Sequence, residues 1–351
     1  MLISATGGSM VWPFLAIYMR QRLQVPLTTV TLLLALNSLA GLVATSVAGP
    51  LVDRFGRKGA MVLSMAGAAL TLLVMSAADT LLWWAILMTL NGAFMPLYRV
   101  GGDSMVADLI GPALRTRAYA LLRTSTNLGV AIGPAVGGFI TAVSYAITFY
   151  IATGAQLAFA LLLLIFTTET VPQFMDSGRS QAGEGYGRIL SDRQFLTFCG
   201  IYSLAGMAYS LLMTLLPVYA KENFGVLESQ YGFIVGTNAT MVVLFQYAVT
   251  RVTDRYHPLP VLAAGALFFA IGTFSVAWGY NFTTFLISMV ILTIGEMIMI
   301  PPSIAFAANL APPEMRGRYM SVYGLAWSIA FGIGPVIGGL LNDRVAPVAI
   351  W

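Results

Sequence analysis

Residues 49–58 read GPLVDRFGRK, and residues 250–259, which lie 201 positions later, read TRVTDRYHPL. Both segments contain an Asp-Arg pair, Asp53-Arg54 and Asp254-Arg255, followed by an aromatic residue. The same offset relates Gly133-Pro134 to Gly334-Pro335 and Asn37 to Asn238. Because Asp, Arg and Pro are uncommon in this chain, their agreement at one offset predicts a duplicated unit, repeated in parallel.

The composition places these units in a membrane. Hydrophobic residues make up 58% of the chain, and the mean hydropathy is +0.83. Charged residues make up 9%, against about 25% in soluble proteins. The net charge of +4 is spread over several short loops, so we expect no binding of nucleic acid. The sequence predicts an all-α integral membrane protein in contact with lipid.

A membrane-spanning helix needs roughly 20 mostly apolar residues. Eleven such runs lie at about residues 1–19, 28–52, 59–78, 81–107, 116–142, 145–167, 195–219, 229–252, 258–278, 282–308 and 317–341. One long polar, glycine-rich stretch separates the sixth run from the seventh. We therefore expect a first transmembrane half at 1–168, a linker at 169–193 and a second half at 194–351.

Alternate loops differ in basic residues, and this difference predicts the orientation. One side carries Arg54, Arg57, Lys58, Arg115, Arg117, Arg179, Arg188, Arg193, Arg251, Arg255, Arg316 and Arg318. The other side carries Arg20, Arg22, Lys221 and Arg344. The positive-inside rule makes the first side cytoplasmic, together with the linker. The expected location is the inner (plasma) membrane of a bacterium.

The repeat also predicts a helix that the chain does not contain. The sixth run should recur at about residues 346–368, but the chain ends at Trp351. The expectation is therefore a partial sequence of a twelve-helix protein.

Residues 49–58 resemble the loop 2-3 signature of the major facilitator superfamily, G-x-L-[AS]-D-R-x-G-R-[KR]. Only Val52 departs from it, at the small-residue position. The resemblance implies two six-helix halves in parallel repeat that work by alternating access as a secondary transporter. It also implies that Asp53 meets the start of the eleventh helix and that Arg57 meets Asp108 at the end of the fourth.

Such pairs would form a gate that closes the cytoplasmic side and breaks when that side opens. The alternative is a tight turn with solvated anchoring charges. The gate hypothesis includes Gly49, Asp53, Arg54, Gly56, Arg57, Lys58 and Asp108, with Arg251, Asp254 and Arg255 as the second-half copy.

Glycines on the fifth helix are similar to the helix 5 signature of the drug:proton antiporter branch, G-x8-G-x3-GP-x2-GG. The first glycine of that signature is replaced by Ala120. Close helix packing alone also accounts for such small residues. The fifth helix contains Gly129, Gly133, Pro134, Gly137 and Gly138, and the eleventh repeats Gly334, Pro335, Gly338 and Gly339.

Several charges lie inside predicted helices, where each costs about 2.5 to 3.5 kcal/mol on the insertion scale. Glu296 lies about 18 Å from the cytoplasmic end of the tenth helix, and Arg99 about 13 Å from that of the fourth. The resemblance places these two helices around a central cavity, on facing walls. We hypothesise that Glu296 carries a proton and that Arg99 and Asp103 tune it or compete for it. A permanent Arg99–Asp103 pair and a structural Glu296 are the alternative.

The remaining candidates are polar or aromatic side chains that could contact substrate, although interhelical hydrogen bonding is the commoner use of such groups. They are Asn37, Asn127, Tyr209, Asn238, Gln246, Tyr323 and Trp327.

The function that this pattern favours is proton-coupled efflux of drugs or small lipophilic metabolites by a monomer. The alternative is a proton-coupled importer of a sugar, organic acid or other small nutrient. The chain has one His and one Cys and lacks HExxH and GxSxG motifs, which argues against an enzyme. We expect no catalytic residue, no metal and no cofactor.

Overall fold

The computed structural model describes residues 1–170, 186–312 and 315–351. Within these ranges it describes all side chains except those at positions 53, 107, 112, 113, 115–117, 119, 120, 123, 186 and 316–318. The described chain is helical, and eleven of its segments are long and apolar enough to span a membrane. The predicted eleven spans are therefore confirmed.

The first half begins with a span made of α1 (Leu2–Val11), the 3-10 helix η1 (Trp12–Phe14) and α2 (Leu15–Leu23). Pro13 in η1 accounts for this interruption, because proline lacks the backbone donor that an α-helix needs. The next spans are α3 (Leu27–Phe55), α4 (Arg57–Met75), α5 (Leu81–Leu109), α6 (Pro112–Val143) and α7 (Tyr145–Phe166).

The second half contains α9 (Arg193–Phe224), α10 (Glu228–Thr253), α11 (Pro258–Ser275) with η2 (Val276–Trp278), α12 (Phe282–Leu310), α13 (Arg316–Arg344) and η4 (Pro347–Ile350). The largest difference from the predicted bounds is the end of α9, which runs past residue 219. Part of the predicted linker is the short helix α8 (Tyr186–Ser191), and its Ile189 is fully buried. Residues 171–185 of that linker lie outside the described residues.

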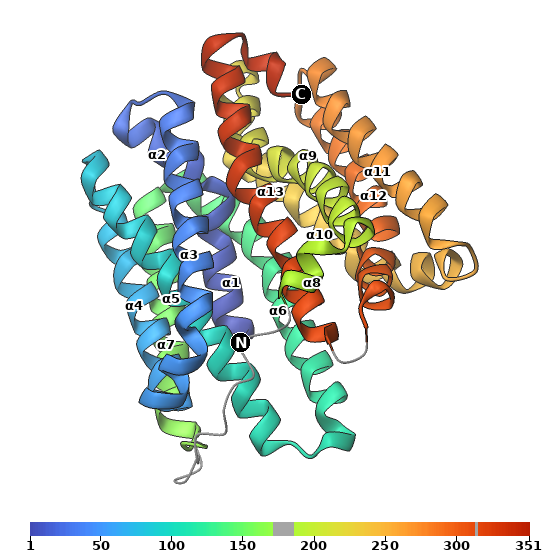
Figure 1. Cartoon of the computed structure of the whole chain (residues 1–351). Coiled ribbons are helices and arrows are strands. Elements are labelled where there is room, and N and C mark those ends of the chain that lie inside the picture. Colours follow the sequence, from blue (N-terminus) through green and yellow to red (C-terminus); the bar gives the residue numbers. More distant parts are fainter. Residues whose placement is uncertain (171–185, 313–314) are drawn as a thin grey trace.

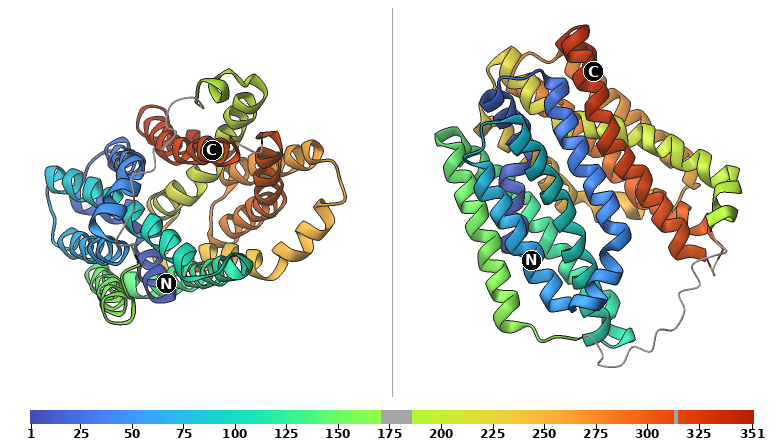
Figure 2. Two further views of the ribbon diagram at one scale, coloured as in Figure 1. Left: turned by 60° about the horizontal axis from the view of Figure 1, so that its bottom comes forward. Right: turned by 60° about the vertical axis from the view of Figure 1, so that its left-hand side comes forward.

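The helices form two bundles, α1–α7 and α9–α13, coloured blue to green and yellow-green to red in Figure 1. The bundles meet where α3 lies beside α13 and α6 lies beside α10 (Figure 2). Residues 169–170, at the end of the first half, and the α3–α4 turn lie at one end, which the predicted orientation makes cytoplasmic. We call the opposite end, with α2 and the last turn of α9, the external side.

The duplication is visible in individual hydrogen bonds. Ser9 Oγ donates to the Gly129 carbonyl at 3.0 Å and joins α1 to α6. Ser210 Oγ donates to the Ala330 carbonyl at 3.0 Å and joins α9 to α13. Both partners of the second bond lie 201 positions after those of the first. The repeat therefore extends to how the first helix of each half packs on the fifth.

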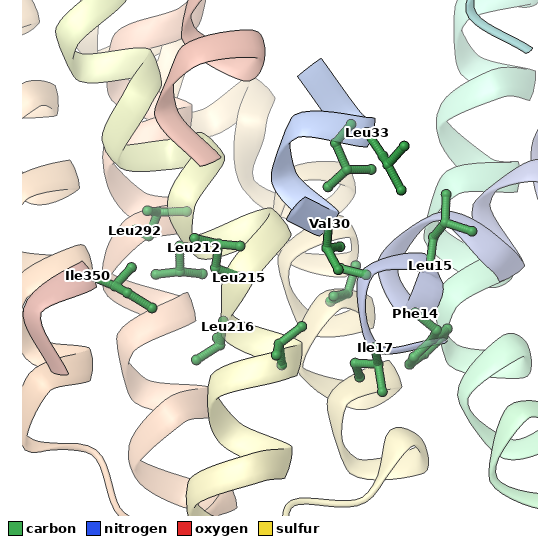
Figure 3. Close-up of a cluster of buried hydrophobic side chains, with 14 of the residues drawn as sticks. Phe14, Leu15, Ile17, Val30, Leu33, Leu212, Leu215, Leu216, Leu292 and Ile350 are labelled. Carbon is green, nitrogen blue, oxygen red and sulfur yellow. The ribbon is translucent and has the colours of Figure 1, made fainter. Parts of the chain in front are cut away.

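The hydrophobic core joins the halves at the external side. In Figure 3 the first-half residues Phe14, Leu15 and Val30 face the second-half residues Leu212 and Leu215 within one buried cluster. First-half members of this cluster come from α1–α2, the start of α3, the end of α4 and the starts of α5 and α7. A separate cluster holds cytoplasmic parts of the first half together: Met61, Met65, Met105, Phe159, Ala160 and Leu163.

Candidate functional site

The α3–α4 turn is held by two acidic residues at the cytoplasmic end of the first half. Gly56 adopts a φ of +86°, a conformation that L side chains rarely adopt. Arg57 Nη1 then lies 2.6 Å from Asp108 Oδ2 and donates to the Thr170 carbonyl at 2.9 Å. The ion pair that the resemblance implies is present, and the Arg57 side chain is buried.

Glu169 is the second acidic residue, and the sequence analysis had placed it in the linker. Its carboxylate accepts hydrogen bonds from the backbone N–H groups of Arg57 at 2.9 Å and Lys58 at 3.1 Å. These are orphan donors at the start of α4, where a negative charge also interacts favourably with the helix dipole. Thr170 Oγ1 donates to Asp108 Oδ2 at 2.9 Å, so the end of the first half is fastened to the turn.

Other members of the gate hypothesis make fewer contacts. Arg54 is exposed beside the Phe55 ring, and a Cβ atom at Gly49 would meet nothing within 4 Å. The Asp53 side chain lies outside the described residues, so its contact with the eleventh helix stays a prediction. The second-half copy of this motif consists of Arg251, Asp254 and Arg255. All three side chains are exposed, and they take part in none of the ion pairs among the described side chains.

The small residues of α6 and α13 lie at close helix crossings. Gly129, Gly133 and Gly137 of α6 face α1, and a Cβ atom at Gly137 would lie 2.6 Å from the Met10 carbonyl oxygen. On α13, Gly334 and Gly338 face α9.

The last glycine of each motif crosses to the other half. A Cβ atom at Gly138 would lie 2.6 Å from the Glu228 carbonyl oxygen of α10. One at Gly339 would lie 3.0 Å from Thr28 Cα of α3. Close packing is therefore a use of both motifs, within each half and between the halves.

Polar contacts join the halves at their external ends. Arg20 Nε of α2 lies 2.6 Å from Glu222 Oε1 of α9. Asp343 of α13 accepts from the backbone N–H and the hydroxyl of Thr28, both at 2.7 Å, at the start of α3.

A third contact is more buried. Tyr145 Oη of α7 donates to Glu228 Oε1 of α10 at 2.6 Å. Lys221 of α9 also pairs with Glu228, and its ammonium lies 5.8 Å from the centre of the Tyr145 ring. We call these three contacts, Arg20–Glu222, Asp343–Thr28 and Tyr145–Glu228–Lys221, the external latch.

Glu296 lies in the middle of α12, next to polar groups of two other helices. Asn238 Nδ2 of α10 donates to Glu296 Oε2 at 2.7 Å and also to Thr293 Oγ1 at 2.9 Å. The Tyr209 hydroxyl of α9 lies close to the same carboxylate. The carboxylate is partly buried, and no cation among the described side chains bonds to it.

A chain of packed aromatic side chains begins at Tyr209, next to this carboxylate. Tyr209 packs against Trp327, with ring centroids 5.4 Å apart, and Trp327 packs against Phe331 at the same distance. Tyr202 stacks on Tyr323 with centroids 4.9 Å apart, and on Trp327 at 5.8 Å. These rings come from α9 and α13 and form a continuous group, which we call the aromatic cluster.

Arg99 and Asp103 lie on α5, and both are exposed. Arg99 interacts electrostatically with Asp103, which is one turn further along the helix. The described contacts do not link Arg99 to Glu296. The structure therefore forms two separate groups, Glu296 with neutral donors and Arg99 with Asp103.

Two of the candidate amides form hydrogen bonds to neighbouring helices. Asn37 Nδ2 donates to the Met88 carbonyl at 2.9 Å, and Gln246 Nε2 donates to the Met297 carbonyl at 3.0 Å. Asn127 is exposed on α6. Of the candidate amides, only Asn238 contacts Glu296.

A small cavity of about 30 Å³ lies between the halves, just below the external latch. Ser38 and Thr214 are its polar lining residues, and the aromatic Phe331 connects it to the aromatic cluster. The full lining is Trp12, Ala16, Leu34, Ser38, Met213, Thr214, Phe331 and Pro335. In the described part of the chain, no three His, Cys, Asp or Glu residues come together as metal ligands would.

The sequence profile of the Major Facilitator Superfamily matches residues 1–219 and 198–351, which together cover the chain. The chain belongs to the major facilitator superfamily. It is a transporter of small molecules and not an enzyme, and it is a multi-pass protein of the inner membrane.

Relatives in this superfamily include an antiporter of monovalent cations and a multidrug resistance protein. A Na(+), Li(+), K(+)/H(+) antiporter of Planococcus maritimus is 27% identical, over 94% of this chain and 85% of the relative. Multidrug resistance protein MdtH of Escherichia coli O1:K1 / APEC is 28% identical, over 84% of this chain and 73% of the relative.

Solved structures show the same fold. The nucleoside transporter NupG aligns with a TM-score of 0.81 at 13% identity, over 100% of this chain and 93% of that chain. A bacterial homologue of the lysosomal transporter Spinster, in an inward-facing and unoccupied conformation, aligns with a TM-score of 0.80 at 14% identity. That alignment covers 97% of this chain and 80% of the homologue.

The contacts of this superfamily member also define its conformational state. Among the side chains that the structure describes, the hydrogen bonds and ion pairs between the halves lie at the external side, in the latch. The core shared by the halves also lies there. The described contacts therefore hold the external side of the transporter closed.

Proposed function

We propose that this transporter exports lipophilic organic cations in exchange for protons, and that Glu296 carries the proton. The observation that supports this proposal is a carboxyl group in the middle of a membrane-spanning helix, next to the neutral donors Asn238 and Tyr209. A charged carboxylate in a low-dielectric site needs a cation or water to compensate it. Such a group can bind a proton or a cationic substrate, and the two ligands then exclude each other.

This competition gives a mechanism for exchange. When the site faces the cytoplasm, the deprotonated Glu296 binds the cation. When the site faces outward, a proton replaces the cation and the substrate leaves. Binding of either ligand removes the uncompensated charge, so the halves can close around the site and change sides.

The aromatic cluster supports the choice of substrate class. Tyr209 lies beside the carboxylate and packs on Trp327, and aromatic faces attract cations by about 0.5 to 2 kcal/mol each. An apolar body with one positive charge fits this combination better than a sugar, which needs several hydrogen-bonding groups. Two relatives, a cation/proton antiporter and a multidrug resistance protein, agree with exchange and with export.

Two sets of contacts would alternate during the cycle. The external latch holds the present state. On the cytoplasmic side, we propose that Arg57, Asp108 and Glu169 keep the α3–α4 turn rigid, so that Asp53 can meet α13 when that side closes. We expect the protein to work as a monomer in contact with lipid.

The experiment is transport by the purified protein in liposomes with an imposed pH gradient. The panel contains a lipophilic aromatic monocation, a neutral sugar, an organic anion and Na⁺. We expect the aromatic monocation to accumulate in the compartment from which protons leave. Glu296→Gln should abolish this accumulation, and Asp79→Asn, an exposed position between α4 and α5, should not.

Accumulation that ignores the pH gradient, or that persists in Glu296→Gln, would contradict the proposal. Coupled transport of the sugar or the anion would instead indicate an importer or exporter of that class. Coupled movement of Na⁺ would indicate a monovalent cation/proton antiporter.

A further inference from the structure

A second group of buried polar atoms lies in the second half, where two tyrosine hydroxyls of the aromatic cluster meet a serine of α12. Ser303 Oγ of α12 and Tyr323 Oη of α13 are 2.8 Å apart, and the two residues are 0% and 8% exposed. The Tyr202 hydroxyl of α9 lies within hydrogen-bonding range of both, and Tyr202 is 5% exposed. Three hydroxyls from three helices thus meet inside the membrane.

The register of the helices relates this group to Glu296. Tyr202 and Tyr209 are seven residues apart on α9, and Glu296 and Ser303 are seven residues apart on α12. Seven residues make nearly two helical turns, so each pair lies on one face, about 10 Å apart along the axis. Because α9 runs outward and α12 runs inward, the Tyr202–Ser303 group lies on the cytoplasmic side of the Tyr209–Glu296 group. Tyr202 interacts electrostatically with Glu296 across this span.

A third polar pair continues the series to the cytoplasmic surface. Tyr319 lies one turn before Tyr323 on α13, and its hydroxyl donates to Asp192 Oδ2 at 3.0 Å. Asp192 caps the start of α9, where its other oxygen accepts from the Phe195 N–H at 3.0 Å. The polar groups therefore follow one line from Glu296 to the start of α9.

We propose that the hydroxyls of Tyr202, Ser303 and Tyr323 relay protons between Glu296 and the cytoplasm. The inference rests on the proposed function, since it adds a route for the proton that Glu296 carries. Each hydroxyl accepts a proton on an oxygen lone pair and passes its own proton to the next group. One O–H bond forms as another breaks, so every hydroxyl ends neutral, and water bridges the longer spans.

The route lies inside the second half, between α9, α12 and α13, and not between the halves. Trp327 packs on both Tyr202 and Tyr209 and so covers the route along its length. A substrate that fills the space between the halves would therefore leave the route open. This separation lets the proton leave Glu296 while a new cation approaches from the cytoplasm.

Variants that remove one hydroxyl and keep the packing test the relay. They are Tyr202→Phe, Tyr323→Phe and Ser303→Ala. Tyr231→Phe is the matched control, because its hydroxyl is also buried in the second half but donates to the Met213 carbonyl at 3.3 Å, away from the route. Ser303→Thr keeps a hydroxyl and should behave as the unaltered protein.

Two rates are measured in liposomes: uptake of the aromatic monocation driven by a pH gradient, and its exchange at equal pH. For each relay variant we expect driven uptake to fall about tenfold. Exchange should stay unchanged in Ser303→Ala, a residue outside the aromatic cluster, since exchange needs no net proton movement. The ratio of driven rates in H₂O and D₂O should rise in these variants, because proton transfer becomes rate-limiting.

The proposal is wrong if pH-driven uptake in the three variants is as fast as in the control. It is also wrong if driven uptake and exchange fall together, as they would from a packing defect. If the tyrosine variants do not fold, the comparison of Ser303→Ala with Ser303→Thr decides the question. If the unaltered protein showed no proton-coupled transport, the proposed function itself would be wrong. That outcome is distinct from a failure of the relay alone.

Discussion

Removal of one hydroxyl should weaken the external latch and change the side to which the transporter opens. Tyr145 Oη donates at 2.6 Å to Glu228, a buried carboxylate that is 6% exposed. Tyr145 belongs to the first half and Glu228 to the second, so this bond can form only while the external ends are together. Tyr145→Phe keeps the ring and removes only the donor.

The size of the effect follows from the type of bond. A hydrogen bond to a charged group contributes about 1.5 to 3 kcal/mol. The loss falls on the inward-facing state, because in the outward-facing state the hydroxyl would bond to water. Since each 1.4 kcal/mol is a factor of ten, the ratio of inward-facing to outward-facing molecules should fall about 10- to 100-fold. The Arg20–Glu222 pair, with side chains 24% and 38% exposed, should contribute only about 0 to 1 kcal/mol.

The assay is labelling of a cysteine below the latch. Ser38 lines the cavity between the halves, so Ser38→Cys, in a background that carries Cys199→Ser, reports access from outside. An impermeant thiol reagent added externally should label this position slowly, and about 10- to 100-fold faster when Tyr145→Phe is added. Tyr150→Phe, an exposed position on the same helix, should leave the labelling rate unchanged.

An unchanged or slower labelling rate in Tyr145→Phe, with an unchanged melting temperature, would refute the reasoning. In that case the shared apolar core, and not the Tyr145–Glu228 bond, would hold the external side closed. A rate increase in the Tyr150→Phe control would mean that the assay reports loosening of α7 in general.

Three further predictions concern packing and the cytoplasmic turn. Gly138→Ala should speed external labelling, because its Cβ atom would lie 2.6 Å from a carbonyl oxygen across the interface, whereas Gly154→Ala, with open space, should not. Glu169→Gln should lower the melting temperature by weakening the cap of α4, at a cost of about 1 kcal/mol. Arg57→Ala should cost about 1 to 3 kcal/mol, measured by denaturant unfolding in detergent, since it leaves Asp108 without its cation.

The sequence predicted the spans well because length and hydropathy largely decide them. No solvent in the bilayer core can bond to a free backbone, so long apolar runs must be helical. The Arg57–Asp108 contact was predicted through the family resemblance, and the structure contains it. The agreement of Ser9–Gly129 with Ser210–Ala330 shows how far one sequence offset describes the packing of both halves.

Other contacts could not be predicted, because they depend on residues far apart in the chain. Asp343 meets Thr28 across 315 positions, and neither residue belongs to a recognisable motif. Glu169 was assigned to the linker because a polar, glycine-rich stretch follows it. One signal was available: an acid three residues after an apolar run, at the same membrane surface as the basic α3–α4 turn.

Depth along a helix was easier to predict than rotation about its axis. The rise per residue placed Arg99 and Glu296 at similar depths, but the described contacts leave them in separate groups. The sequence repeat also did not predict that the two equivalent residues differ in their partners. Asn37 donates to a backbone carbonyl, whereas Asn238 donates to Glu296. The difference arises because Glu296 is present in only one half, where Met95 is its counterpart.

The most direct test of the central claim is proton movement caused by substrate. In liposomes loaded with a pH-sensitive dye, addition of the aromatic monocation without an imposed gradient should move protons in the opposite direction. Glu296→Gln, which imitates the protonated carboxyl group, should bind the cation weakly and should move no protons. Proton movement by Glu296→Gln at the rate of the unaltered protein would contradict the account, because another group would then carry the proton.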